Sequence, residues 1–110
     1  MPTLIEKCLA SALVAAKKAG DVILEVYEGK IDVTYKEDDS PLTLADERAH
    51  RTIVKYLPSI SISHIPILSE EGKDIPYEKR AEWEYLWLVD PLDGTKEFVK
   101  RRDEFTVNIA

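Results

Sequence analysis

Hydrophobic residues recur at helical intervals along the first quarter of the chain. From about residue 4 to residue 28, apolar side chains return every three or four positions, which predicts an amphipathic helix. Thr3 and Glu6 have the spacing of a capping box at its start, and Gly29 follows its end. Gly20 lies inside the segment, where a glycine can bend a helix. The apolar positions of this stripe are Leu4, Ile5, Cys8, Leu9, Ala12, Leu13, Ala16, Ala19, Ile23 and Val26.

A second helix is predicted after a short alternating segment. Apolar and polar residues alternate over residues 31–36, which is typical of a half-buried strand, and a polar loop follows up to Pro41. From Leu42 onward the helical spacing returns, and Pro58 ends it. We expect the core-facing residues of this helix to be Leu42, Ala45, Ala49, Ile53, Tyr56 and Leu57.

Two short apolar runs in the second half of the chain predict strands that end in carboxylates. The first covers residues 65–68 and is followed, after one serine, by Glu70 and Glu71. The second covers residues 85–89 and is followed directly by Asp90. If these strands lie side by side, their terminal carboxylates converge; if not, the carboxylates are solvated charges at strand ends.

The remaining segments complete an α+β pattern. A charged stretch over residues 73–84 predicts a surface segment with a helical turn, residues 96–102 a short helix, and residues 105–110 a further strand. A chain of 110 residues holds at most one domain. Because the last strand is followed by no turn or polar tail, we expect the domain to continue beyond residue 110.

Composition excludes several functions. The net charge of -6, from 21 acidic and 15 basic residues, argues against a nucleic-acid surface. No apolar run approaches the roughly 18 residues of a membrane span, and the N-terminus has no signal-peptide pattern. The one cysteine, Cys8, lies on the apolar stripe and is expected to be a buried structural thiol. A reducing, cytoplasmic location is the expectation.

The candidate chemistry lies in six residues that begin at Asp90 and read Asp-Pro-Leu-Asp-Gly-Thr. We expect Pro91 and Gly94 to bend the backbone, so that the two carboxylates and the Thr95 hydroxyl fall inside the bend. Asp90 and Asp93 would suit a hard divalent cation, which prefers oxygen ligands. A hairpin is the structural alternative, because Asp-Gly between apolar runs is a strong turn signal. A hairpin, however, requires neither the proline nor the threonine.

Other site types fit less well. Aspartyl-nucleophile phosphatases place Asp-x-Asp-Gly-Thr after an apolar strand, whereas this chain has one more residue between the carboxylates. Both carboxylates can then face a metal pair and leave water as the nucleophile. An EF-hand is excluded, because its alternating oxygen ligands and its glycine are missing. His50 and His64 have no partner at ligand spacing and are assigned no role.

Three segments together resemble the inositol monophosphatase superfamily. Residues 36–46 match its N-terminal signature, residues 69–71 its first metal-ligand motif, and residues 87–95 its main metal-binding motif. They occur in the family's order. Thr43 and Asp46 lie in the first of these segments, where, taken alone, they are explained by helix capping and the helix dipole.

Details of the last segment are similar to the bacterial 3'(2'),5'-bisphosphate nucleotidase branch. These details are Lys-Glu-Phe at residues 96–98 and the run over residues 104–110; Arg102 and Asp103 depart from the branch, where an Asn-Gly-like turn is common. The resemblance implies the N-terminal part of a layered αβαβα phosphatase fold, with a mostly antiparallel sheet flanked by helices. Residues 1–110 would form the N-terminal α+β portion of that domain.

The resemblance also implies roles. Two or three Mg²⁺ ions would be held by three carboxylates and one backbone carbonyl, those of Glu70, Asp90, Asp93 and Leu92. The substrate phosphate would be bound by Asp93, Gly94 and Thr95. Thr95, paired with Asp46, would activate the attacking water, and Glu71 and Thr43 would support these groups. The family completes its metal site with a downstream Trp-Asp pair that these 110 residues lack, so we expect this chain alone to be inactive.

The implied reaction is hydrolysis of the 3'-phosphate of adenosine 3',5'-bisphosphate to AMP. The resemblance further implies a role in sulfate assimilation, lithium sensitivity, a homodimer, and a cytoplasmic protein or one peripheral to the inner membrane. The alternatives are an inositol or sugar phosphate phosphatase on the same scaffold, and an inactive cation-binding fragment. Thr95 and Asp46 favour catalysis, because neither is needed merely to hold a metal.

Overall fold

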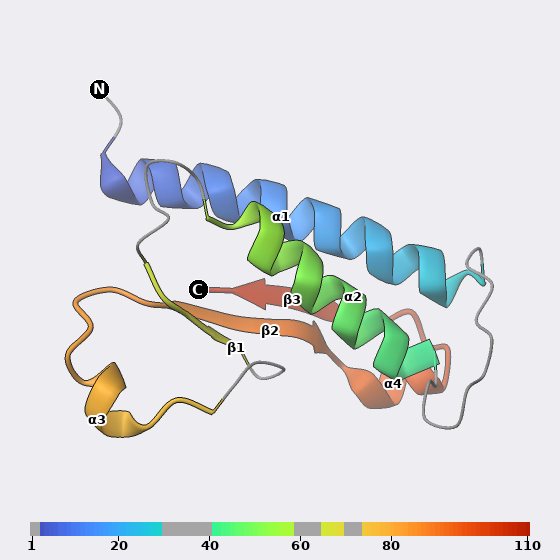
Figure 1. Ribbon diagram of the computed structural model, residues 1–110. Coiled ribbons are helices and arrows are strands. Elements are labelled where there is room, and N and C mark those ends of the chain that lie inside the picture. Colours follow the sequence, from blue (N-terminus) through green and yellow to red (C-terminus); the bar gives the residue numbers. More distant parts are fainter. Residues whose placement is uncertain (1–2, 30–40, 59–64, 70–73) are drawn as a thin grey trace.

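The computed structural model describes residues 3–29, 41–58, 65–69 and 74–110 (Figure 1). Along the chain the elements are α1 (Leu4–Tyr27), α2 (Pro41–Tyr56), β1 (Ile67–Ser69), α3 (Tyr77–Arg80), β2 (Trp87–Asp93), α4 (Thr95–Val99) and β3 (Thr106–Ile109). The α+β prediction is confirmed, as are the helical turn in the charged stretch and the short helix after the glycine. The strand predicted at 31–36 lies outside the described residues.

The capping box that starts α1 is present. The Thr3 hydroxyl accepts a hydrogen bond from the Glu6 backbone N–H at 3.2 Å, and the Glu6 carboxylate accepts one from the Thr3 N–H at 3.4 Å. The helix continues through Gly20, and Gly29, with φ +71°, follows its end. Cys8 is half-buried and packs against the core.

The predicted apolar stripe of α1 is confirmed in the second half of the helix and only in part in the first half, where Leu4, Cys8 and Ala12 are partly buried and pack against the core. Ala19 and Ile23 are buried, whereas three predicted core residues are exposed, namely Ile5, Leu9 and Leu13. The physical reason is the side of the helix on which they lie: these three residues recur every four positions, one position on from the residues that pack against the core, and so lie outside the side that contacts α2 and β3. No helix in the described part of the chain is both long enough and apolar enough to cross a membrane.

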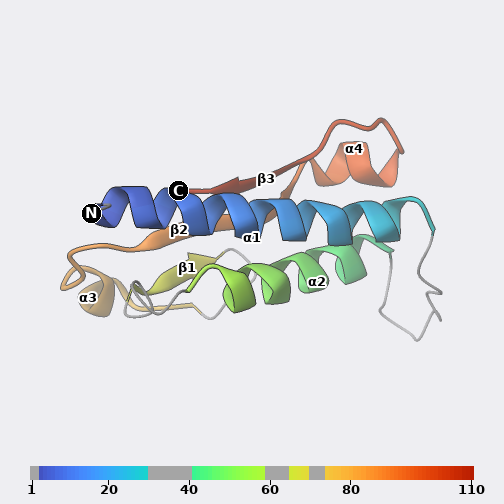
Figure 2. The same ribbon diagram turned by 90° about the horizontal axis from the view of Figure 1, so that it is seen from above.

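The two long helices lie side by side on one face of the sheet (Figures 1 and 2). The core face of α2 is largely as predicted, because Ala45, Ala49, Ile53 and Leu57 are each 0% exposed. Tyr56 is 36% exposed, so its predicted burial is wrong. It lies at the side of the helix, where Lys18 Nζ stands 5.6 Å from its ring centroid. The side chain of Leu42 is not among those described.

The described strands form a mixed sheet in the order β1-β2-β3. β1 pairs with β2 in parallel, and β2 pairs with β3 antiparallel, whereas we expected mostly antiparallel pairing. Alternation along β2 places Trp87 and Val89 on the buried, helix-covered side, while Leu88 is 52% exposed on the other side. Because β1 and β2 are parallel neighbours, both strands deliver their final residues to the same edge of the sheet.

An aromatic cluster joins the end of α1 to the segment after β2. The ring centroids of Tyr27 and Phe98 are 5.2 Å apart, and those of Tyr27 and Phe105 are 4.8 Å apart in an edge-on arrangement. The Tyr27 hydroxyl also donates a hydrogen bond to the Asp103 carboxylate at 2.6 Å. That hydrogen bond raises the pKa of Tyr27 above its ordinary value. These contacts fix the position of α4.

Candidate active site

The segment from Asp90 to Asp93 is extended rather than bent. β2 runs through Pro91 to Asp93, so the predicted bend at the proline is wrong. On β3 the partner of Asp90 is Asn108, and the partner of Asp93 is Thr106, so β2 uses one residue more than β3. Such a bulge tolerates a proline, because the ladder hydrogen bonds are interrupted there. It also changes the direction in which the second carboxylate points.

The predicted bend at Gly94 is confirmed. Its φ of +90° lies in the left-handed region. A Cβ at this position would stand 2.6 Å from the Glu104 carbonyl oxygen and 3.1 Å from the Phe105 Cα, so only glycine fits. The Gly94 carbonyl accepts a hydrogen bond from the Phe98 N–H at 2.9 Å, which starts α4 directly at Thr95.

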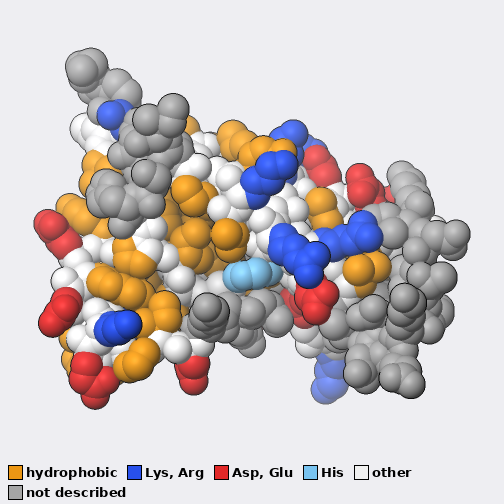
Figure 3. Space-filling model, in the orientation of Figure 1, with side chains coloured by type: hydrophobic (Ala, Val, Ile, Leu, Met, Phe, Trp, Pro, Cys, Tyr) orange, Lys and Arg blue, Asp and Glu red, His pale blue; other side chains and the backbone are white. Residues whose placement is uncertain are grey.

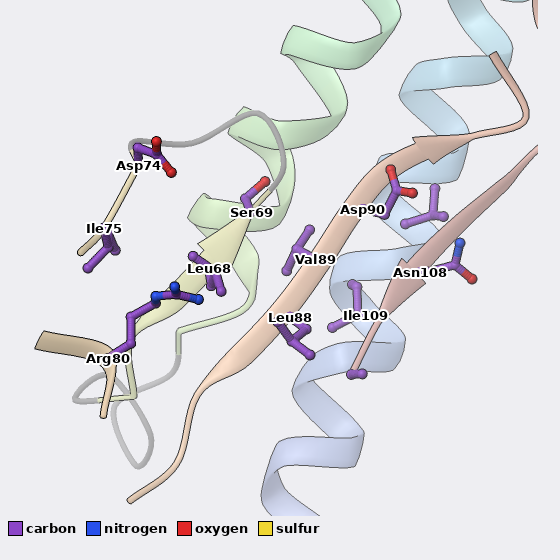
Figure 4. Close-up of a pocket in the computed structure, with 12 residues that line it drawn as sticks. Leu68, Ser69, Asp74, Ile75, Arg80, Leu88, Val89, Asp90, Asn108 and Ile109 are labelled. Carbon is purple, nitrogen blue, oxygen red and sulfur yellow. The ribbon is translucent and has the colours of Figure 1, made fainter. Parts of the chain in front are cut away.

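Both candidate carboxylates of β2 lie beside Asn108. Asp90 is half-buried and is the cross-strand partner of Asn108, so their side chains share a face of the sheet (Figure 4). The Asn108 side-chain amide donates to the exposed Asp93 carboxylate at 3.4 Å and to the Thr106 hydroxyl at 3.1 Å. Asn108 was not predicted to take part. Its signal is an amide between two apolar residues of a strand, Val107 and Ile109.

Two other predicted ligands can be placed only in part. Leu92 is 3% exposed, so its side chain anchors the backbone carbonyl that was predicted to bind metal. Glu70 and Glu71 lie outside the described residues. The described register pairs Ser69 with Val89, so β1 ends beside the residue that precedes Asp90. Convergence of the two strand ends stays a prediction, and this register favours it.

The elements that carry the two predicted catalytic residues are in contact. Asp46 is half-buried in the second turn of α2, and Thr95 is the exposed first residue of α4. α2 packs against both β2 and α4. The side chain of Thr43 is not described. The pairing of Asp46 with Thr95 therefore stays a prediction that the packing of these elements favours.

His50 contacts the end of β1, although we assigned it no role from the sequence. Its Nδ1 lies 3.0 Å from the hydroxyl oxygen of Ser69, which is 8% exposed. Either group can be the donor, depending on the histidine tautomer. His50 follows Asp46 by four residues, so both lie on the same side of α2. Its partner is distant in the sequence, and spacing gave no signal of the contact.

A groove of about 880 Å³ opens on the side of the sheet that faces away from α1 and α2 (Figure 4). Its lining includes Asp90, Asn108 and Ser69, together with Arg80 from α3. The Arg80 Nε is buried and has no hydrogen-bond partner among the described residues. Asp93 lines a separate hollow of about 600 Å³. Within the described residues, the two carboxylates of β2 thus open onto different hollows.

Positive charge gathers on one face despite the negative total. Lys and Arg side chains lie over α2 in the view of Figure 3, and the exposed residues of this helix include Arg51 and Lys55. A local basic surface raises the concentration of anions near it, even on an acidic protein. This face is compatible with an anionic substrate.

The donor chemistry fits magnesium, although the described residues supply only part of a site. Asp90 and Asp93 offer carboxylate oxygens, which Mg²⁺ prefers. In the ranges that the structure describes, no three His, Cys, Asp or Glu side chains come together in a way that could hold a metal ion. A complete site would therefore need further ligands such as Glu70.

The chain is similar in sequence to known phosphatases. Residues 5–110 match the model of the inositol monophosphatase family. A 3'(2'),5'-bisphosphate nucleotidase CysQ of Salmonella typhimurium is 54% identical over 97 residues, which are 86% of this chain and 39% of that protein. CysQ of Haemophilus influenzae is 38% identical over 110 residues, which are 100% of this chain and 40% of that protein. The chain thus spans about two fifths of the length of these relatives.

Solved structures show the same fold. CysQ from Bacteroides thetaiotaomicron, described as a bacterial member of the inositol monophosphatase family, superposes with a TM-score of 0.78 at 52% identity. This match covers 92% of this chain and 36% of that one. The extragenic suppressor protein SuhB from Bartonella henselae superposes with a TM-score of 0.69 at 30% identity, over 93% of this chain and 37% of that one. The chain belongs to the inositol monophosphatase family.

Proposed function

We propose that this chain is the N-terminal, metal-binding part of a 3'(2'),5'-bisphosphate nucleotidase, which hydrolyses the 3'-phosphate of adenosine 3',5'-bisphosphate to AMP and phosphate. The observation that carries the proposal is the 54% identity to a nucleotidase of this name. Two features of β2, the strand next to β1, support it: Asp90 is the cross-strand partner of Asn108, and the Asn108 amide donates a hydrogen bond to Asp93. Residues 1–110 would form one portion of a larger phosphatase domain.

The ligands of magnesium would come from the edge where β1 and β2 end. Glu70, Asp90, Asp93 and the Leu92 carbonyl would hold two or three Mg²⁺ ions. Bound magnesium makes water more acidic and stabilises negative charge on a phosphoryl group. Asp90 is held by its place in the sheet, and Asp93 is held by the Asn108 amide. Fixed carboxylates of this kind favour a site formed before the substrate arrives.

The attacking water would be activated by Thr95 and Asp46. The water would pass a proton to the Thr95 hydroxyl oxygen as the threonine passes its own proton to the Asp46 carboxylate. The packing of α2 against α4 supports this pairing. The phosphate would lie against Asp93, Gly94 and the first N–H groups of α4, which have no partner within the helix. Glu71 and Thr43 would hold these groups in place without binding the metal ions themselves.

Several finer properties belong to the same proposal through the family resemblance. They are inhibition by lithium, which would replace magnesium, a role in sulfate assimilation, and a cytoplasmic protein or one peripheral to the inner membrane. A homodimer is also part of it. Each of these properties depends on the reaction or the location of the whole enzyme.

A comparison of substrates tests the proposal. The product of the complete gene would be incubated with magnesium and either adenosine 3',5'-bisphosphate or inositol 1-phosphate, and phosphate release would be measured. We expect a kcat/KM at least about tenfold higher for the nucleotide, with AMP as the product, because a site built for polar substrate groups discriminates strongly. Asp90→Asn is the control, since it should abolish turnover of both substrates. A preference for inositol phosphate would instead establish the alternative phosphatase. Magnesium binding without any phosphate release would establish the inactive cation-binding protein.

A further inference from the structure

The loop between α4 and β3 contains two residues in the left-handed region, although neither is a glycine. Arg101 has φ +56° and Asp103 has φ +60°. A residue with a Cβ is disfavoured in this region, and the conformation persists only where neighbouring contacts hold it. The loop covers residues 100–104, and all five are exposed, so burial of their own side chains does not hold it. The stabilising contacts therefore come from another element.

Tyr27, the last residue of α1, makes these contacts. Its hydroxyl donates a hydrogen bond to the Asp103 carboxylate at 2.6 Å and accepts one from the Asp103 N–H at 3.1 Å. The guanidinium of Arg101 lies over its ring, 4.6 Å from the ring centroid. The Tyr27 side chain is buried, with 8% exposure, so it is itself held firmly by the core. One buried side chain thus contacts both left-handed residues.

Tyr27 also holds the elements on either side of the loop. Its ring packs against Phe98 in α4 and against Phe105, which follows the loop. The Arg101 N–H donates to the Phe98 carbonyl at 3.1 Å, which joins the loop to α4 through the backbone. Tyr27 therefore connects α1 to the whole of the segment from Thr95 to Phe105.

We propose that Tyr27 acts as a latch for residues 95–105. Its hydrogen bonds to Asp103 offset the cost of a left-handed residue that is not glycine, and their loss lets this segment open as one local unit while α1, α2 and the sheet stay folded. Local opening of this kind is a property of segments that few buried contacts hold. Opening would also displace Thr95, the first residue of α4. The latch consists of contacts between described residues, so it holds whether or not the protein hydrolyses a nucleotide.

Limited digestion of the complete gene product with trypsin tests the latch. Trypsin cleaves after Lys and Arg, and the loop begins with three such residues, Lys100, Arg101 and Arg102. Cleavage there requires the turn to open, so its rate reports the population of the open form. Mass spectrometry would quantify the peptides at early times under native conditions. Cleavage after the exposed Lys17 in α1 and Lys55 in α2 is the internal reference for global unfolding.

Three variants separate the hydrogen bond from the backbone strain. Tyr27→Phe removes the hydroxyl and keeps the ring. Asp103→Ala removes the carboxylate and keeps a Cβ at the left-handed position, whereas Asp103→Gly removes the carboxylate and the strain together. Tyr77→Phe is the matched control, because Arg80 lies 5.9 Å from the centroid of this ring in a similar way, but Tyr77 is 69% exposed and lies in α3.

We expect Tyr27→Phe and Asp103→Ala each to speed cleavage in the loop by about tenfold or more, because a hydrogen bond to a charged group is typically worth at least that factor. Asp103→Gly should stay within about threefold of the wild type, because glycine adopts this conformation without steric cost. Tyr77→Phe should match the wild type. Cleavage after Lys17 and Lys55 should be the same in all of these proteins.

Three results would overturn the latch. A wild-type rate of loop cleavage in either Tyr27→Phe or Asp103→Ala would mean that the hydrogen bond does not hold the loop. Equal acceleration in Asp103→Ala and Asp103→Gly would mean that backbone strain plays no part. A parallel rise in cleavage of α1 and α2 would mean that the whole domain unfolds instead of one segment. If Tyr27→Phe fails to fold, the comparison of the two Asp103 variants decides the question.

Discussion

We expect the replacement of Gly94 by alanine, which adds a single carbon atom, to lower the free energy of unfolding strongly. At φ +90° an L-residue is strained, which costs roughly 1–2 kcal/mol. The added Cβ would also stand 2.6 Å from a backbone oxygen, that of Glu104, which cannot turn away as a side chain could. Since β3 must then shift from β2, we expect Gly94→Ala to lower the free energy of unfolding by at least about 3 kcal/mol.

The other glycines provide graded controls. Gly29 has φ +71°, but no atom of the described residues lies within 4 Å of an added Cβ, so Gly29→Ala carries the conformational strain alone and should cost about 1 kcal/mol. Gly20 lies inside α1, and within the described part of the chain no atom stands within 4 Å of an added Cβ, so Gly20→Ala should stabilise by about 0.5–1 kcal/mol.

Urea unfolding of the three variants, followed by circular dichroism, measures these differences. The reasoning is refuted if Gly94→Ala costs no more than Gly29→Ala, because close contact with the backbone would then add nothing. It is also refuted if Gly20→Ala is the most harmful of the three.

Three further predictions follow from other contacts. Asn108→Ala should weaken Mg²⁺ binding by about tenfold, as measured by calorimetry, because Asp93 loses its amide donor; unchanged affinity would contradict the assigned role. Tyr27→Phe should destabilise the fold by removing the bond to Asp103. The folded state raises the pKa of Tyr27, so the loss of stability should be complete below pH ~10, the pKa of an unfolded tyrosine. The loss should become smaller as the pH rises through the pKa of the folded state. A difference in melting temperature between variant and wild type that does not change with pH would disprove this. Ala49→Leu should cost about 1–3 kcal/mol, because Ala49 is 0% exposed and a larger side chain overpacks the core. A variant that unfolds at the same urea concentration as the wild type would count against this prediction.

Local signals in the sequence predicted the elements well. The Thr3 capping box, the period of α2 and the glycine after β2 each act within a few residues, so the sequence displays them directly. The predicted position of Asp90 at the end of an apolar strand is likewise consistent with β2, although the strand continues to Asp93.

Features that depend on distant partners could not be predicted in this way. The bulge at Pro91 depends on the register of β3 against β2, which shifts by one residue between Asp90 and Asp93. The exposure of Leu9 and Leu13 depends on which side of α1 packs against α2 and β3. The contact between His50 and Ser69 joins residues 19 positions apart on different elements.

The buried alanines of the two long helices have a consequence for how Asp46 and His50 move. Ala15, Ala19, Ala45 and Ala49 are each 0% exposed, and α1 and α2 pack closely. An alanine has no side-chain rotamers, so burying it loses no side-chain conformational entropy. It also leaves no alternative packing arrangement that could absorb a small displacement. Fluctuations of α2 should therefore be those of a rigid rod, which carries Asp46 and His50 together and keeps their spacing constant as temperature rises.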